Sequence, residues 1–183
     1  MNSDKYIWRI ARGFSISRIV EYQNESPMPH EFRNSKMFHL EHEIQFAYQG
    51  QICDLSQYDY YPNSIRVPLV SQRGLERVAH LCEKEVQIVE SLILCADGII
   101  PCFLLNSLKT FRCVDWNRSN VMYISGTNQI LKFNLMRLLS GFPDCHVVRL
   151  EEAVSYVLVT PEFRRAFGSC ASCEFLLPAE VLP

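Results

Sequence analysis

Hydrophobic residues recur in short blocks along most of the chain, which is typical of β-strands separated by turns. The first third predicts strands at 6–11, 16–22 and 37–48, with a polar loop over 23–36 that contains two prolines. Residues 51–55 lead into 56–63, which is typical of an irregular surface segment, and 66–70 is typical of a short extended one. Further strands are predicted over seven ranges: 86–94, 99–105, 121–124, 129–135, 147–150, 156–159 and 175–177.

Two stretches carry helical signals instead. The first follows Ser71, whose hydroxyl can accept a backbone N–H at a helix start, and it places apolar residues on one helical face at 75, 78, 79 and 82. The second begins with Thr160, Pro161 and Glu162, which are a capping residue, a proline suited to the first turn and an acid near the helix dipole. Gly168 can end it.

The order of these elements predicts the fold class. Asp97 and Gly98 form a strong hairpin signal between two of the predicted strands. Many strands and few helices, without regular β-α alternation, predict an α+β fold with a mainly antiparallel sheet and a few helices.

Length and composition narrow the class of protein. A chain of 183 residues is one domain or at most two small ones, and 48% hydrophobic residues can build a core. A net charge of −2 argues against a general nucleic-acid binder. The sequence predicts no transmembrane helix, and the start lacks the apolar segment of a secretory signal, so we expect a cytoplasmic protein that does not bind membranes.

Eight cysteines are expected to be reduced thiols in that compartment. Cys170 and Cys173 form the one CxxC motif, whose spacing suits zinc binding or a redox pair. Zinc needs two further ligands at a second paired spacing, and the motif follows a predicted helix rather than opening one. We therefore favour packing for this pair.

No other motif predicts chemistry. The five histidines lie outside nucleophile motifs, and the seven glycines form no phosphate loop. His39, Glu41, His42 and Glu43 resemble a metal site in composition, but on a strand His42 points away from the other three. Residues 115–119 are typical of a turn. We expect no catalytic residues, cofactor or metal; the alternative is a hydrolase that pairs a histidine with Cys145 or Cys170.

Charge is distributed unevenly. Residues 37–65 contain four acids and neither lysine nor arginine, together with four tyrosines. Carboxylates steer basic partners and tyrosines anchor interfaces, so this segment predicts a partner-binding surface. Its candidate residues are Glu41, Glu43, Asp54, Tyr58, Asp59, Tyr60 and Tyr61. The alternative is a solvated loop with tyrosines packed beneath it.

A series of apolar motifs follows from residue 66. It comprises VPLVS (67–71), a helix, VQIVE (86–90), FLLN (103–106), CVDWNRS (113–119), VRL (148–150) and the stretch 159–167 that leads to Phe175. Over roughly residues 60–180 this series resembles a bacterial family, formerly of unknown function, that is classed as the eleventh immunity type of polymorphic toxin systems.

The resemblance implies a cytoplasmic protein without enzyme activity that binds and neutralises a cognate toxin. It divides the chain into a partner-specific strand and loop portion, 1–65, and an α+β portion, 66–183, which can also form one continuous domain. Besides the hydrolase, the sequence leaves open an interaction domain unrelated to toxins.

Overall fold

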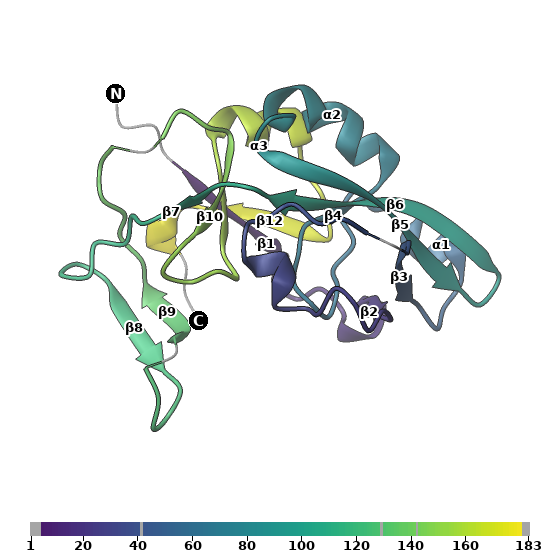
Figure 1. The fold of residues 1–183 in the computed structure, drawn as a ribbon, viewed down its shortest axis with the longest axis horizontal. Helices are drawn as coiled ribbons and strands as arrows, with labels where there is room; N and C mark the ends of the chain where they lie inside the picture. Colours follow the sequence, from purple (N-terminus) through teal and green to yellow (C-terminus); the bar gives the residue numbers. More distant parts are fainter. Residues whose placement is uncertain (1–4, 41, 129, 142, 181–183) are drawn as a thin grey trace.

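The computed structural model describes residues 5–40, 42–128, 130–141 and 143–180. Within them the chain forms two five-stranded sheets and a separate two-stranded sheet, with two helices side by side above the larger sheets (Figure 1). The α+β prediction is confirmed.

The first sheet joins the two ends of the chain. Its strand order is β12 (Cys173–Leu176), β1 (Tyr6–Ile10), β11 (Val157–Val159), β10 (Val147–Leu150) and β7 (Thr110–Phe111). All pairings are antiparallel except that of β10 with β7. In β1, Ile7 pairs with Leu158 on one side and with Leu176 on the other, so the N-terminal strand lies between two C-terminal ones.

The second sheet is built around a long hairpin. Its order is β2 (Glu21–Tyr22), β3 (Ile44–Ala47), β5 (Val86–Cys95), β6 (Gly98–Ser107) and β4 (Leu69–Val70). The predicted turn at Asp97 and Gly98 joins β5 to β6, and β3 pairs with β5 in parallel. Because β1 belongs to the first sheet while β2 and β3 belong to the second, residue 65 marks no boundary between sheets.

Alternation along the strands explains the long apolar runs. In β11, Val157 and Val159 face the cluster beneath the helices, whereas Leu158 faces a second cluster on the other side of the sheet. In β10, Val147 and Val148 divide in the same way. Such strands are buried on both faces, so they read as continuous hydrophobic stretches rather than as alternating ones.

Both predicted helices form with their predicted caps. In α2 (Gln72–Cys82) the Ser71 hydroxyl accepts a hydrogen bond from Gly74 N at 3.0 Å. In α3 (Pro161–Phe167) the Thr160 hydroxyl accepts one from Phe163 N at 3.2 Å, and Gly168 with φ +82° follows the last turn. The rings of Phe163 and Phe167 both pack on Trp8, with centroids 5.2 Å from it.

Several predicted boundaries are wrong. The strand expected at 16–22 is a 3-10 turn, η1 (Ile16–Arg18), followed by the short β2, and only the end of 37–48 becomes β3. Phe38 lies outside the sheet, and its backbone is hydrogen-bonded to a side chain instead. Its N–H donates to Gln87 Oε1 and its carbonyl accepts from Gln87 Nε2, both at 2.8 Å. The residues that precede the predicted irregular segment 56–63 form a short helix, α1 (Ile52–Leu55), which was not predicted. Two further 3-10 turns, η2 (Glu31–Arg33) and η3 (Pro178–Glu180), were not predicted.

Asp59 links the loop before β4 to the start of α2. Its carboxylate accepts hydrogen bonds from the Ser71 hydroxyl at 3.2 Å, from Arg73 Nε and from Arg77 Nη1 at 2.9 Å. Its backbone carbonyl accepts one from Ser71 N at 3.1 Å. Gly74 lies so close that a Cβ there would stand 2.6 Å from that carbonyl oxygen.

We therefore expect Gly74→Ala to destabilise the protein, although alanine is the better helix former by about 1 kcal/mol. Overpacking against backbone costs about 1–3 kcal/mol, which outweighs that gain. Thermal melting followed by circular dichroism measures the difference. The exposed His80→Ala in the same helix is the control, expected to change stability by less than about 0.5 kcal/mol. A more stable Gly74→Ala protein would contradict the close approach.

Candidate functional site

The predicted partner-binding segment is largely interior. Tyr58, Asp59, Tyr60 and Tyr61 are only 3–7% exposed, which corrects the expectation that they extend into solvent. The Tyr60 ring packs 5.3 Å from that of Trp8, and Arg18 Nη1 donates to the Tyr58 hydroxyl at 2.6 Å. Burial raises the pKa of Tyr61 to about 12. Burying an aromatic ring is favourable, so these tyrosines pack beneath the loop instead of facing solvent. They present no exposed ring to which a partner could anchor.

The other predicted acids of that segment, Glu43 and Asp54, lie in different surroundings. Glu43 is exposed and lines a shallow depression of about 440 Å³ with Ile88 and Glu90. Asp54 is half-buried and accepts a hydrogen bond from Gln51 N at 2.9 Å at the start of α1. Glu41 lies outside the described residues. The structure therefore does not gather the seven predicted residues on one surface.

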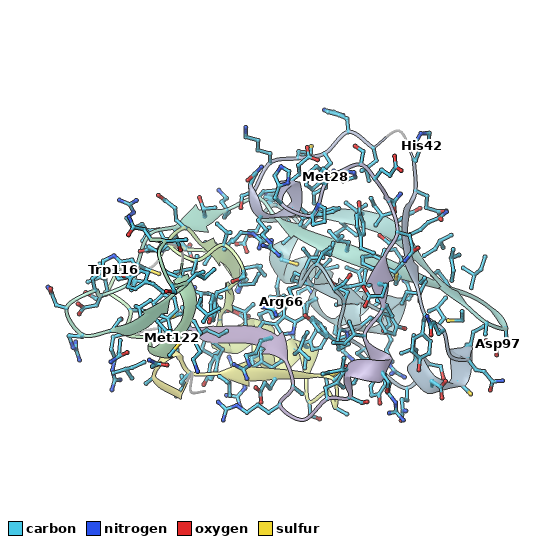
Figure 2. All side chains as sticks on the ribbon, turned by 90° about the horizontal axis from the view of Figure 1, so that it is seen from below. Met28, His42, Arg66, Asp97, Trp116 and Met122 are labelled. Carbon is cyan, nitrogen blue, oxygen red and sulfur yellow. The ribbon has the colours of Figure 1, made fainter. Side chains whose placement is uncertain are left out.

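A different surface carries exposed apolar side chains. The strands β8 (Asn120–Tyr123) and β9 (Ile130–Leu135) form a hairpin that stands away from both larger sheets (Figure 1). Around it, five large apolar residues are 41–58% exposed: Trp116, Met122, Tyr123, Ile124 and Leu131. We call these five the hairpin surface. It lies at the far end of the molecule from His42 and Asp97 (Figure 2).

The base of the hairpin is firmly packed. Phe133 is 1% exposed, and its ring lies 5.7 Å from Tyr156 and 6.3 Å from Trp116. In the turn that carries Trp116, the Asp115 carboxylate accepts from Asn117 N at 3.2 Å and the Ser119 hydroxyl accepts from Arg137 N at 2.9 Å. Residues 115–119 thus form the predicted turn, and they hold Trp116 at the edge of the core.

A pocket of about 830 Å³ opens beside the hairpin. Trp116, Tyr123 and Leu131 border it on one side, and Arg112 and Glu151, paired at 3.3 Å, lie on another. Sequence reasoning missed this surface. Its signal in the sequence is the apolar run at 121–124, which the pattern alone predicts only as a strand.

An unusual cation lies behind this pocket. Arg149 in β10 is fully buried, and its Nη1 donates to the carbonyl of Val154, a residue that borders the pocket. Among the described residues, no group accepts from its Nε or Nη2. Desolvation, with the nearby charge of Arg33, lowers the pKa of Arg149 to about 10.

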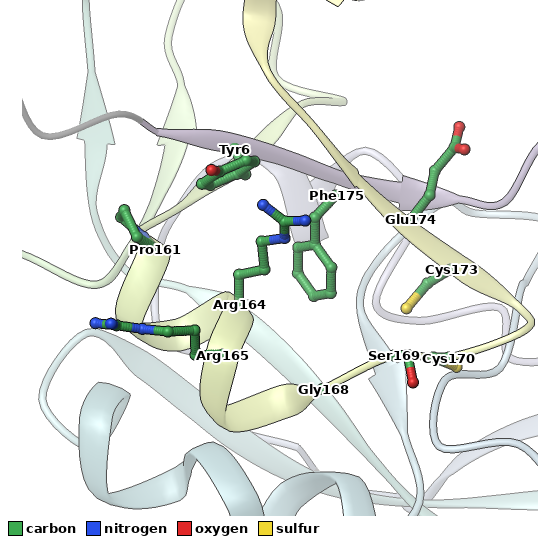
Figure 3. A pocket seen from close by; sticks show the side chains of 10 residues that line it. All are labelled: Tyr6, Pro161, Arg164, Arg165, Gly168, Ser169, Cys170, Cys173, Glu174 and Phe175. Atoms are coloured by element: carbon green, nitrogen blue, oxygen red, sulfur yellow. The ribbon is translucent and has the colours of Figure 1, made fainter.

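The CxxC motif lies in a second pocket, of about 670 Å³, between α3 and β12 (Figure 3). Cys170 is half-buried and Cys173 is 4% exposed. Hydrogen bonds to its sulfur, the first of them from Cys173, lower the pKa of Cys170 to about 5, whereas the same contact and burial raise the pKa of Cys173.

The alternative Cys/His pairs are not assembled among the described residues. Cys145 is buried, which raises the pKa of its thiol, while the His146 ring bonds Thr160 Oγ1 at 3.0 Å instead. The described residues that line the Cys170 pocket include no histidine. Within the described part of the chain, His, Cys, Asp and Glu form no group of three that could hold a metal, and no helix could span a membrane.

Comparison with known proteins leaves the family open. No protein-family description matches this sequence, and no curated protein matches it either.

The buried cation yields a stability prediction. The pKa of Arg149 is lower in the folded state than in the unfolded state, so the charged guanidinium destabilises the folded protein at neutral pH. This cost in folding free energy decreases as the pH rises through 10, because the folded state then releases the proton first. We expect Arg149→Met to raise stability by about 1–4 kcal/mol, since buried ions are often replaced favourably by apolar groups.

Thermal melting at pH 7 measures this. Arg118→Met, at a side chain that is 70% exposed, is the control and should change stability by less than about 0.5 kcal/mol. A clear loss of stability in Arg149→Met would show that the guanidinium is well compensated in solution.

Proposed function

We propose that this protein is an immunity protein: it binds a cognate bacterial toxin in the cytoplasm, one to one, and neutralises it without catalysis. The observation that carries the proposal is the hairpin surface. The family resemblance from residue 66 onward supports the function, and the hairpin moves the proposed docking surface from the predicted partner-specific portion, 1–65, into the portion 66–183.

The composition of this surface suits protein recognition. Tryptophan, tyrosine and methionine are enriched at interfaces, and aromatic anchors account for a large share of binding energy. Trp116 is 47% exposed and Tyr123 is 49% exposed, and both border one pocket that a partner side chain can fill. Trp116, Tyr123 and Leu131 gather at this one pocket, whereas the apolar side chains of an ordinary surface are scattered singly.

The form of the hairpin suits docking as well. Each of its strands pairs with the other and with no third strand of the described chain, so both are edge strands. Edge strands expose backbone groups with which a partner can pair, and natural proteins usually protect them. The packed Phe133 fixes the base, so little order has to be gained on binding.

Charge steers the encounter. The ion pair of Arg112 and Glu151 at the pocket edge supplies both signs for partner side chains. The exposed Glu43 remains a predicted steering residue for a basic toxin, together with Asp54 and Glu41. Glu43 would act mainly on the association rate, because an exposed charge adds little to affinity.

The test uses the product of the gene that adjoins this one. We expect its expression alone to stop bacterial growth, co-expression of this protein to restore growth, and the purified pair to run as a one-to-one complex in size-exclusion chromatography with light scattering. A protein that restores growth by turning over a small molecule, without forming a complex, would refute the proposal.

Substitutions then locate the interface. Trp116→Ala and Leu131→Ala should each weaken binding about 5- to 30-fold, which corresponds to about 1–2 kcal/mol. Ile99→Ala is the matched control and should bind like the parent, because Ile99 is 54% exposed and lies two residues after Asp97, which is at the other end of the molecule (Figure 2). Melting curves verify that each variant folds. Folded hairpin variants that bind at parental affinity would remove the hairpin from the interface.

A further inference from the structure

The loop between α3 and β12 brings two thiols together. Cys170 and Cys173 line the same pocket, and Figure 3 shows Cys170 on the loop after Gly168 and Cys173 at the start of β12. Their side chains are hydrogen-bonded to each other. The loop is anchored at its centre, because the buried Ser172 hydroxyl donates to the Tyr60 carbonyl at 2.6 Å.

Donors converge on the Cys170 sulfur. Besides the Cys173 thiol, the backbone N–H groups of Ser172 and Asp59 donate to it. The Ser172 hydroxyl lies 3.1 Å away, but its single hydrogen serves either this sulfur or Tyr60, so the two backbone groups are the constant donors. Arg73 contributes a favourable charge. Fixed donors and a nearby cation are what stabilises a thiolate.

The two sulfurs differ in access. Cys170 is half-buried at the pocket, whereas Cys173 pairs with Ile10 in the sheet and is 4% exposed. The pocket wall holds Arg164, whose guanidinium lies 4.4 Å from the centre of the Tyr6 ring (Figure 3). An exposed arginine beside an accessible sulfur favours an anionic reagent.

We propose that Cys170 and Cys173 form a reversible redox pair, in which Cys170 attacks an anionic low-molecular-weight disulfide and Cys173 resolves the product. The assignment is independent of the proposed toxin binding. It also replaces the interpretation of the CxxC motif as simple packing.

The steps balance as follows. The Cys170 thiolate forms a bond with one sulfur of the small disulfide, whose S–S bond breaks and releases a small thiolate. Cys173 then attacks Cys170 Sγ, the mixed disulfide breaks and a second small thiol leaves with the Cys173 proton. The protein dithiol is oxidised to a disulfide, and the small disulfide is reduced to two thiols.

Oxidised glutathione is the probe, used in a Cys53→Ser background that removes the exposed thiol. After trypsin cleaves at Arg165, both cysteines lie in one peptide, 166–183. We expect mass spectrometry to show this peptide with two hydrogens lost and no glutathione attached. Cys173→Ser should stop at a glutathione adduct on Cys170, and Cys170→Ser should leave the peptide unmodified.

Alkylation by iodoacetamide at pH 6 provides a second readout, on protein that retains Cys53. We expect Cys170 to react at least about tenfold faster than the exposed Cys53, because a thiolate is the reactive form. Cys173→Ala removes a donor and should slow this reaction about tenfold or more. The proposal fails if wild type keeps both thiols free or retains a stable glutathione adduct, or if Cys170 reacts no faster than Cys53.

Discussion

The buried carboxylate of Asp59 is the constraint on which much of the structure depends. It accepts from Arg73, Arg77 and Ser71, and so fixes the loop before β4 to the first turns of α2. Arg77 Nη1 also donates to the Phe167 carbonyl at 3.0 Å, which ties α2 to the end of α3. Hydrogen bonds to a charged group are worth about 1.5–3 kcal/mol each, and a buried charge that loses its partners costs more.

The same residue sets the geometry of the dithiol. The Asp59 backbone N–H donates to the Cys170 sulfur, and the neighbouring Tyr60 carbonyl holds Ser172. Strands from both ends of the chain lie beside this loop, because β1 lies between β11 and β12. In β1, Trp8 packs on Tyr60 and Ile10 pairs with Cys173. The hairpin surface is separate from it, with its own packed base at Phe133. Stability and the proposed thiol chemistry therefore share the surroundings of Asp59, whereas the proposed docking surface lies in another part of the fold.

The sequence predicted local structure well where local signals decide it. Ser71 and Thr160 begin helices, Asp97 and Gly98 turn a hairpin, and 147–150 forms a strand over the predicted range. It misplaced what tertiary packing decides. The composition of residues 58–61, one acid and three tyrosines, is typical of a surface segment. In the structure they are interior, because Arg73 and Arg77 donate to Asp59 and the Trp8 ring packs on Tyr60. Likewise, the hydrogen bonds that lower the pKa of Cys170 come first from Cys173, which the CxxC spacing indicates, but also from the backbone of Asp59, 111 residues earlier, which no spacing along the chain reveals.

Hydrogen exchange of Asp59→Asn measures the central claim, that this carboxylate is a structural hub and not a docking group. The account predicts faster amide exchange in the first turn of α2, at the end of α3 and in the loop 168–173 together, although these segments lie far apart in sequence, while β8 and β9 exchange as in the parent. Exchange that changes only next to residue 59, with the other segments unaffected, would contradict it.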